Sequence, residues 1–268
     1  MASVSSSKTI FLYNGAGASP DCVAETQKFL RSTCGKYSVI PVDFSYMKRE
    51  APPALYVFPG GKAMMMGFEI VSSAEKIKQS VRQGSGLLAF CSGAMVVSSQ
   101  WNYRVPIKEA PFTAGMTSFD FDQPLLLGPA AYAPTFVDVI CESKDMLEEL
   151  RPRNAKIESA TLGDFRCFWS NGPLFGKLKA EDVVVASYQS DPSLNPLLTR
   201  IEPLAAVVHR PSSGSCGSIV LSGIHPEMAE WAHRNGHPLT DSDIESNRRL
   251  FKECCQRAGI ETDPKSCE

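Results

Sequence analysis

Residues 84–94 read Gly-Ser-Gly-Leu-Leu-Ala-Phe-Cys-Ser-Gly-Ala. The apolar run from Leu87 to Phe90 has the length of a buried strand, glycines precede it, and small residues follow Cys91. A strand, a tight turn that carries a nucleophile and then a helix form a nucleophile elbow, in which the turn lifts the side chain clear of the sheet. A helix N-terminus also favours the thiolate. The stretch therefore predicts a reactive strand-end thiol, although a buried and inert cysteine would give the same pattern.

Similar transitions from strand to turn occur on both sides of this stretch. Residues 8–13 are an apolar, β-rich run that leads into a turn at residues 14–19, and Ser19-Pro20 has the pattern of a helix start. The same patterns predict further strands at residues 37–42, 54–58, 182–188, 204–208 and 218–221. Helices are predicted at residues 72–82, 144–150 and 243–258. The last helix has a Ser242–Glu245 capping box and a buried face of Ile244, Phe251, Cys254 and Ala258.

Alternation of strands and helices predicts an α/β fold with a parallel sheet covered on both faces. The loops at residues 14–19 and 59–61 and the turn at Cys91 all follow strands. In parallel sheets the carboxyl ends of the strands meet at one edge, where ligands bind. Residues 101–210 are less regular and predict strands and loops that elaborate the same domain.

The chain has 268 residues, and no linker-like composition divides it. We therefore expect a single domain at residues 8–260, preceded by a disordered lead at 1–7 and followed by a frayed tail at 261–268. Residues 1–7 lack the charged and apolar regions of a signal peptide, so we expect none, and no apolar run has membrane-spanning length.

Charge and cysteine content narrow the class of protein. The formal net charge of −2 gives no reason to expect nucleic acid or an anionic membrane as a partner. Nine cysteines without a repeating spacing predict reduced thiols and a cytoplasmic location rather than a disulfide framework. No zinc-finger spacing occurs, and His233 and His237 flank an Asn-Gly turn, so we expect neither a metal nor another cofactor.

His225 and Glu227 are two residues apart and directly follow a predicted strand. In extended backbone their side chains point the same way, so the carboxylate can orient the imidazole ring. Together with Cys91 they are candidates for a catalytic triad, in which His225 moves the proton and Cys91 attacks an acyl group. The candidate oxyanion donors are the backbone amides of Ser92 and of Gly60 or Gly61.

These motifs, in this order along the chain, resemble class I glutamine-amidotransferase-like domains. A closer resemblance is to the biotin-protein ligase N-terminal domain family, which has similar segments at residues 13–19, 91–94, 171–172 and 222–227. The resemblance runs from Thr9 to Trp231. It implies a flavodoxin-like three-layer sandwich around a mostly parallel sheet, with a Cys-His-Glu triad. The loop with Asn14, Gly15 and Gly17 lacks the third glycine of a dinucleotide fingerprint, and we expect it, with Asn171 and Gly172, to line the substrate cleft.

Two features depart from the resemblance. Glutaminases of this class carry a glutamine four residues after the nucleophile, where this chain has Met95. We therefore expect a small-molecule or peptide-like acyl substrate other than glutamine. The chain also lacks a segment like the Gly-Arg-Gly-Arg motif of the biotin ligase catalytic domain, so we do not expect it to biotinylate a target.

Three hypotheses remain open on the sequence alone. The first is an enzyme that hydrolyses or transfers an acyl group with Cys91, His225 and Glu227. The second is a non-catalytic module on the same scaffold that binds a ligand or a protein and has a link to biotin metabolism. The third is a redox role for Cys91. The oligomeric state is not predicted.

Overall fold

The computed structural model describes residues 8–98, 101–103, 130–133, 153–170, 172–176, 178–189 and 205–264. The strands are β1 (Thr9–Tyr13), β2 (Ser38–Val42), β3 (Leu55–Phe58), β4 (Gly86–Phe90), β5 (Trp101–Tyr103), β6 (Ala130–Ala133), β7 (Arg153–Ser159), β8 (Gly163–Trp169), β9 (Leu174–Gly176), β10 (Val183–Tyr188), β11 (Ala205–Arg210) and β12 (Ile219–Ser222). The helices are α1 (Pro20–Thr33), α2 (Phe44–Arg49), α3 (Ala63–Ile70), α4 (Ala74–Arg82), α5 (Ser92–Val97), the 3-10 helix η2 (Pro226–Met228), α7 (Ala229–Arg234) and α8 (Asp241–Arg257).

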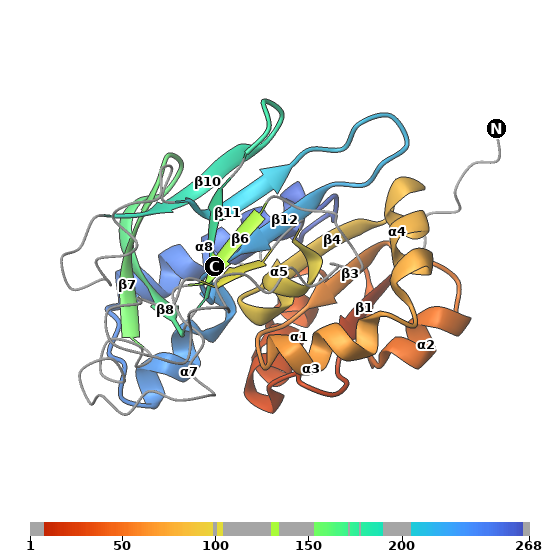
Figure 1. Cartoon of the computed structure of the whole chain (residues 1–268). Coiled ribbons are helices and arrows are strands. Elements are labelled where there is room, and N and C mark those ends of the chain that lie inside the picture. The colour runs from red at the N-terminus through yellow and green to blue at the C-terminus, as the bar shows by residue number, and fades with distance from the viewer. Residues whose placement is uncertain are drawn as a thin grey trace, which may run out of the picture.

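The strands form one mixed sheet in the order β2-β1-β3-β4-β12-β11-β10-β7-β8 (Figure 1). From β2 to β12 every neighbouring pair is parallel. From β12 to β8 every neighbouring pair is antiparallel. The short strands β5, β6 and β9 join the sheet through β11. The less regular second half of the sequence thus supplies the antiparallel part of the sheet.

Alternate residues of the central strands enter two separate cores. Ile10 and Leu12 face one core with α1 and α8, whereas Phe11 and Tyr13 face the other with α2, α3, α4 and α5. Both faces of the sheet are therefore covered by helices, because strands buried on both sides place apolar residues at every position. The predicted α/β fold with three layers is confirmed, and its sheet is parallel in the N-terminal part.

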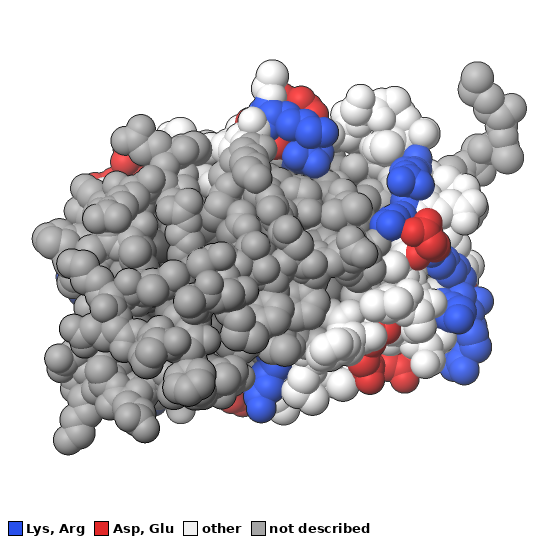
Figure 2. All heavy atoms as spheres, viewed as in Figure 1, with Lys and Arg blue, Asp and Glu red and all other residues white. Residues whose placement is uncertain are grey.

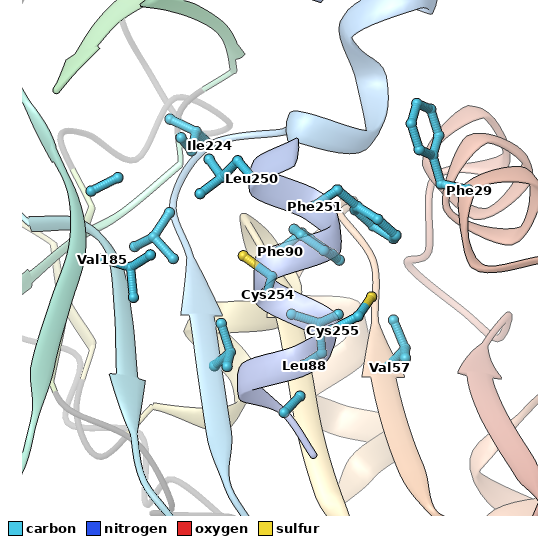
Figure 3. Close-up of a cluster of buried hydrophobic side chains, with 14 of the residues drawn as sticks. Phe29, Val57, Leu88, Phe90, Val185, Ile224, Leu250, Phe251, Cys254 and Cys255 are labelled. Carbon is cyan, nitrogen blue, oxygen red and sulfur yellow. The ribbon is translucent and has the colours of Figure 1, made fainter. Parts of the chain in front are cut away.

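Helix α8 packs across the middle of the sheet. Phe251 stacks on Phe90 of β4 with ring centroids 5.7 Å apart and also meets Phe29 of α1 at 5.4 Å. Cys254 and Cys255 lie on the same buried face, near Leu88 and Val57 (Figure 3). The C-terminal helix is thus part of the core that holds β4 and β12 in place.

The start of α8 differs from the sequence prediction. The helix is capped by Thr240, whose hydroxyl accepts a hydrogen bond from the Asp243 amide at 3.1 Å, while the Asp243 carboxylate accepts one from the Thr240 amide at 3.0 Å. The predicted Ser242–Glu245 box is wrong by two residues. Asp243 also accepts a hydrogen bond from the Arg166 amide of β8 at 2.8 Å, so a tertiary contact favours Thr240 over Ser242.

Some other predictions differ from the structure or lie outside its described residues. Helices α2 and α3 were not predicted, because α2 is short and α3 is apolar over most of its surface and shows no helical period. The predicted helix at 144–150 lies outside the described residues. At the predicted C-terminal tail, the Asp263 amide donates to the Thr33 carbonyl at 2.9 Å and Lys36 pairs with Glu261 at 3.0 Å, so these residues lie against the end of α1.

Charged side chains of both signs lie close together over the described part of the face drawn in Figure 2. This arrangement agrees with the small net charge of −2. None of the described helices is both long enough and apolar enough to cross a membrane.

Candidate functional site

Cys91 lies in the turn between β4 and α5. Its backbone dihedrals are φ 48° and ψ −114°, and among the described residues it is the one residue other than glycine with a positive φ. Such a conformation costs about 1–3 kcal/mol and is found mainly at functional sites. The Cys91 amide donates to the Ser222 carbonyl of β12 at 2.7 Å, which fixes the turn. A Cβ on Gly93 would lie 2.4 Å from the Phe58 carbonyl oxygen, so only glycine lets the first turn of α5 pack this close to the end of β3.

His225 and Glu227 form a buried pair beyond the end of β12. His225 Nδ1 and Glu227 Oε1 are 2.8 Å apart, and their residues are 2% and 0% exposed. The pair meets across the first turn of η2, not along the extended backbone expected from the sequence, because Pro226 starts this 3-10 helix. The His225 amide donates to the Phe168 carbonyl of β8 at 2.9 Å, which fixes the backbone of His225 against this strand.

Opposing effects act on the His225 imidazole. Burial favours the neutral ring and would lower its pKa, but the negative charges of Glu227 and Cys91 and their hydrogen bonds to the ring outweigh burial. The pKa of His225 is therefore raised well above its usual value. Because Glu227 occupies Nδ1, Nε2 is the ring nitrogen left for Cys91.

The glycine loop after β3 packs against the His225 ring and is joined to the turn at Cys91. A Cβ on Gly60 would lie 2.5 Å from His225 Cε1, so glycine allows the ring to reach the loop. Gly61 has φ 156° and a Cβ there would lie 2.0 Å from the Gly17 carbonyl oxygen. The Ser92 hydroxyl donates to the Gly61 carbonyl at 2.6 Å and joins the loop to the turn at Cys91.

The backbone amides next to Cys91 are available to a ligand. In the described part of the chain, the amides of Gly60, Gly61 and Ser92 meet no hydrogen-bond acceptor. The amide of Ser92 is the first of α5, where a helix leaves its N–H groups without intrahelical partners. These are the donors that the motifs predicted for an oxyanion.

A cavity of about 570 Å³ opens beside these groups. Cys91 and His225 line it together with Cys22, and apolar side chains including Phe168 and Trp231 form much of its remaining wall. The rings of Phe168 and Trp231 meet edge to face with centroids 5.7 Å apart. An apolar cavity with a few converging polar groups is typical of a small-molecule site.

The family model for "Biotin-protein ligase, N terminal" matches residues 8–262. The chain belongs to this family. The family predicted from the motifs is thereby confirmed. No curated protein sequence matches the chain significantly.

Solved structures agree with this family member at the level of the fold. A "Crystal structure of glutamine amidotransferase" superposes with a TM-score of 0.56 and 16% identity over 93% of this chain and 99% of that chain. A putative GMP synthase protein from Thermoplasma acidophilum has a TM-score of 0.48 and 10% identity over 94% of each chain. The first of these structures shows that the two chains share a fold.

Not all residues predicted for the cleft lie in the cavity of this biotin-protein ligase N-terminal family member. Gly17 lines it, whereas Asn14, Gly15 and Gly172 are not among its lining residues. Gly15 packs on the Tyr13 ring, where a Cβ would lie 2.7 Å from Cε2. Gly172 packs on the backbone of Gly223, where a Cβ would lie 1.7 Å from the carbonyl oxygen. Asn171 lies outside the described residues.

Cys22 is a site residue that was not predicted, because it lies in none of the motifs. Its Sγ, a ring nitrogen of His225 and a carboxylate oxygen of Glu227 all lie within 4.8 Å of one another. Burial raises the pKa of Cys22 to about 11, so it is a neutral thiol at neutral pH. A usable signal exists in the sequence, because a helix that starts at Pro20 places its first turn at the same sheet edge as Cys91.

Proposed function

We propose that this chain hydrolyses or transfers an acyl group at an amide or related bond, with Cys91 as the nucleophile. One observation carries the proposal. His225, whose Nδ1 lies 2.8 Å from the buried Glu227 carboxylate, lines the same cavity as Cys91 in its strained turn. Strain at a turn costs stability and persists when the position serves a function.

The arrangement supports a mechanism in two stages. His225 accepts the Cys91 proton, and the thiolate attacks the acyl carbon. The resulting oxyanion is stabilised by the amides of Ser92 and of Gly60 or Gly61. As the intermediate collapses, the imidazolium gives its proton to the leaving amine, and an acyl-thioester remains on Cys91. His225 then takes a proton from water or another acceptor nucleophile, whose attack releases the acyl group and restores the thiol.

Glu227 keeps the ring in the orientation that this sequence of steps needs. Its Oε1 accepts the Nδ1 proton of His225, which leaves Nε2 to exchange a proton with Cys91. The Glu227 carboxylate helps to raise the pKa of His225 above its usual value, so the ring can hold the proton that it accepts from Cys91. Glu227 thus acts as a positioning residue through His225.

The cavity wall indicates the substrate class. Met95, four residues after Cys91, is buried in α5 and offers no hydrogen-bond donor for a carboxamide. Met95 is not among the residues that line the cavity, whereas Phe168, Met228 and Trp231 are, and they make part of its wall apolar. We therefore propose a substrate with an apolar acyl part rather than glutamine.

A second candidate function rests on the burial of the site. Cys91 is only 5% exposed and its thiol lies 3.4 Å from the Ser170 carbonyl oxygen, to which it can donate a hydrogen bond. A neutral, hydrogen-bonded thiol suits a binding module, with a ligand related to biotin metabolism as one candidate.

Thiol labelling separates the two functions. We expect iodoacetamide at pH 7 to label Cys91 first, and His225→Ala to slow this labelling at least about tenfold, because the thiolate loses its imidazolium partner. Labelling of Cys91 in His225→Ala recovers at alkaline pH. His233→Ala, in which the lost ring is one hydrogen-bonded to the Leu239 backbone and outside the cavity lining, is the control and keeps the wild-type rate. The measurement is site-resolved mass spectrometry over time.

The same experiment has an outcome that excludes the enzyme. Equal labelling of several cysteines, unchanged by His225→Ala, contradicts a Cys91–His225 ion pair and favours the binding module. A panel of p-nitroanilide and thioester substrates with apolar acyl groups supplies the activity test. Turnover that disappears in Cys91→Ser, with an acyl adduct on Cys91 in the wild type, supports the enzyme.

A further inference from the structure

Cys22 brings a second thiol to the imidazole of the proposed triad. It is the third residue of α1, it is 8% exposed, and it lines the same cavity as Cys91 and His225. A Cβ on Gly60 would lie 3.1 Å from Cys22 Sγ and 3.4 Å from His225 Nε2. Both atoms therefore face the same small space beside the glycine loop.

We propose that Cys22, Cys91 and His225 form a binding site for a thiophilic divalent cation of the zinc type, in which Glu227 holds the imidazole. Two thiolates and one imidazole are a known ligand set for zinc sites that keep a fourth position open. A carboxylate on the second ring nitrogen is the usual outer partner of a zinc-bound histidine. Here that partner is Glu227, at 2.8 Å from Nδ1.

The distance between Cys22 and His225 requires only a small closure of these two side chains around an ion. Cys22 Sγ, a His225 ring nitrogen and a Glu227 carboxylate oxygen lie within 4.8 Å of one another. Sulfur and nitrogen ligands of one tetrahedral zinc ion are about 3.5 Å apart, since the bonds are about 2.3 and 2.0 Å long. A side-chain shift of about 1 Å therefore brings Cys22 and His225 to bonding distance. Cys91 lines the same cavity as Cys22 and His225.

A separate observation is a carboxylate oxygen without a partner at the site. Glu227 is fully buried, and its Oε2 has no hydrogen-bond partner among the described residues. A buried carboxylate oxygen without a partner is costly. A cation bound at Nε2 would compensate the Glu227 charge through the ring.

Binding of the ion displaces protons from the side chains that ligate it. The ion binds thiolates and a neutral imidazole, so each ion that binds displaces the protons that these groups carry, and affinity rises with pH. An ion on Cys91 Sγ also removes the lone pair that would attack an acyl carbon. The occupied site is therefore unreactive, whether or not the proposed acyl chemistry occurs.

Cobalt is the probe for this site because thiolate-bound Co²⁺ absorbs in the near ultraviolet. We expect the full chain to bind one Co²⁺ with a thiolate charge-transfer band, and Zn²⁺ to displace it. Cys22→Ala and His225→Ala should each weaken binding at least about tenfold, and Cys22→Ala should also lower the intensity of the band. Glu227→Gln should weaken binding about 10- to 100-fold, as expected for an outer partner.

Cys216→Ala is the matched control, because Cys216 is an exposed free cysteine outside the cavity, and it should bind as the wild type does. Circular dichroism establishes that each variant is folded, and Cys22→Ser replaces Cys22→Ala if the latter is not. Protection of Cys91 from iodoacetamide by Zn²⁺ in the wild type supplies a second readout.

Unchanged affinity and band in Cys22→Ala, or no Co²⁺ binding by the wild type, overturns the proposal. No substrate is present in these titrations, so they are independent of the acyl chemistry. Loss of metal binding with His225-dependent labelling of Cys91 intact would reject the cation site and leave the proposed function standing.

Discussion

At the scale of single residues, the site depends on small side chains that let backbone and rings approach. Cys91, His225 and Glu227 could be proposed from the sequence, because each follows a short apolar strand within a recognisable motif. Cys22 lies in none of these motifs, and the helix start at Pro20 is its one signal in the sequence. Gly60 was expected only as an amide donor, yet it also makes room for the His225 ring.

Gly60→Ala tests this packing. The added Cβ would lie 2.5 Å from His225 Cε1, so the ring must move away from Cys91. We expect the rate of Cys91 labelling at pH 7 to fall about tenfold, towards that of His225→Ala. Gly236→Ala is the control: its φ of 89° makes the substitution cost about 1 kcal/mol of stability, but no atom of the site is near. A wild-type labelling rate in Gly60→Ala contradicts the packing argument.

At the scale of helices and strands, the buried central strands were predictable and several helices were not. Strands such as β4 and β12 are short apolar runs bounded by glycine or serine, which is a local signal. The start of α8 was misplaced because Thr240 and Ser242 are both reasonable caps in sequence, and the choice is made by the Asp243 contact with β8.

Substitution of the two candidate caps distinguishes them. Thr240→Ala removes the acceptor for the Asp243 amide, and we expect the free energy of unfolding to fall by about 1 kcal/mol. Ser242→Ala, at an exposed position inside the helix, should change it by less than about 0.5 kcal/mol. Urea unfolding followed by circular dichroism measures both. A larger loss in Ser242→Ala would show that the cap lies where the sequence suggested.

At the scale of the whole molecule, the order of strands could not be predicted from the sequence. The local patterns indicated an α/β sheet, but the pairing of β12 with β4 and β11 depends on contacts between distant segments. The helices on each face, and the antiparallel strands from the second half, follow from that pairing. The Phe29, Phe90 and Phe251 contacts connect both ends of the chain to the central strand.

Phe251→Ala tests how much this contact stabilises the molecule. Phe251 is fully buried, so we expect a loss of about 3–5 kcal/mol in the free energy of unfolding. Phe68→Ala, at a residue of α3 that is 69% exposed, should change it by less than about 0.5 kcal/mol. Chemical denaturation of the purified chain provides the comparison. Similar values for the two variants would contradict a core role for α8.

The place of β12 has a consequence for how the chain is made. This strand is the last of the sheet in sequence and lies between β4 and β11, so a ribosome must deliver it before the centre of the sheet can close. His225 and Glu227 follow it by only a few residues. A nascent chain that stops before β12 carries Cys91 without its base, and it also lacks the Ser222 carbonyl that fixes the turn. The same segment thus completes both the sheet and the site, so the thiol gains its partners only when folding is complete.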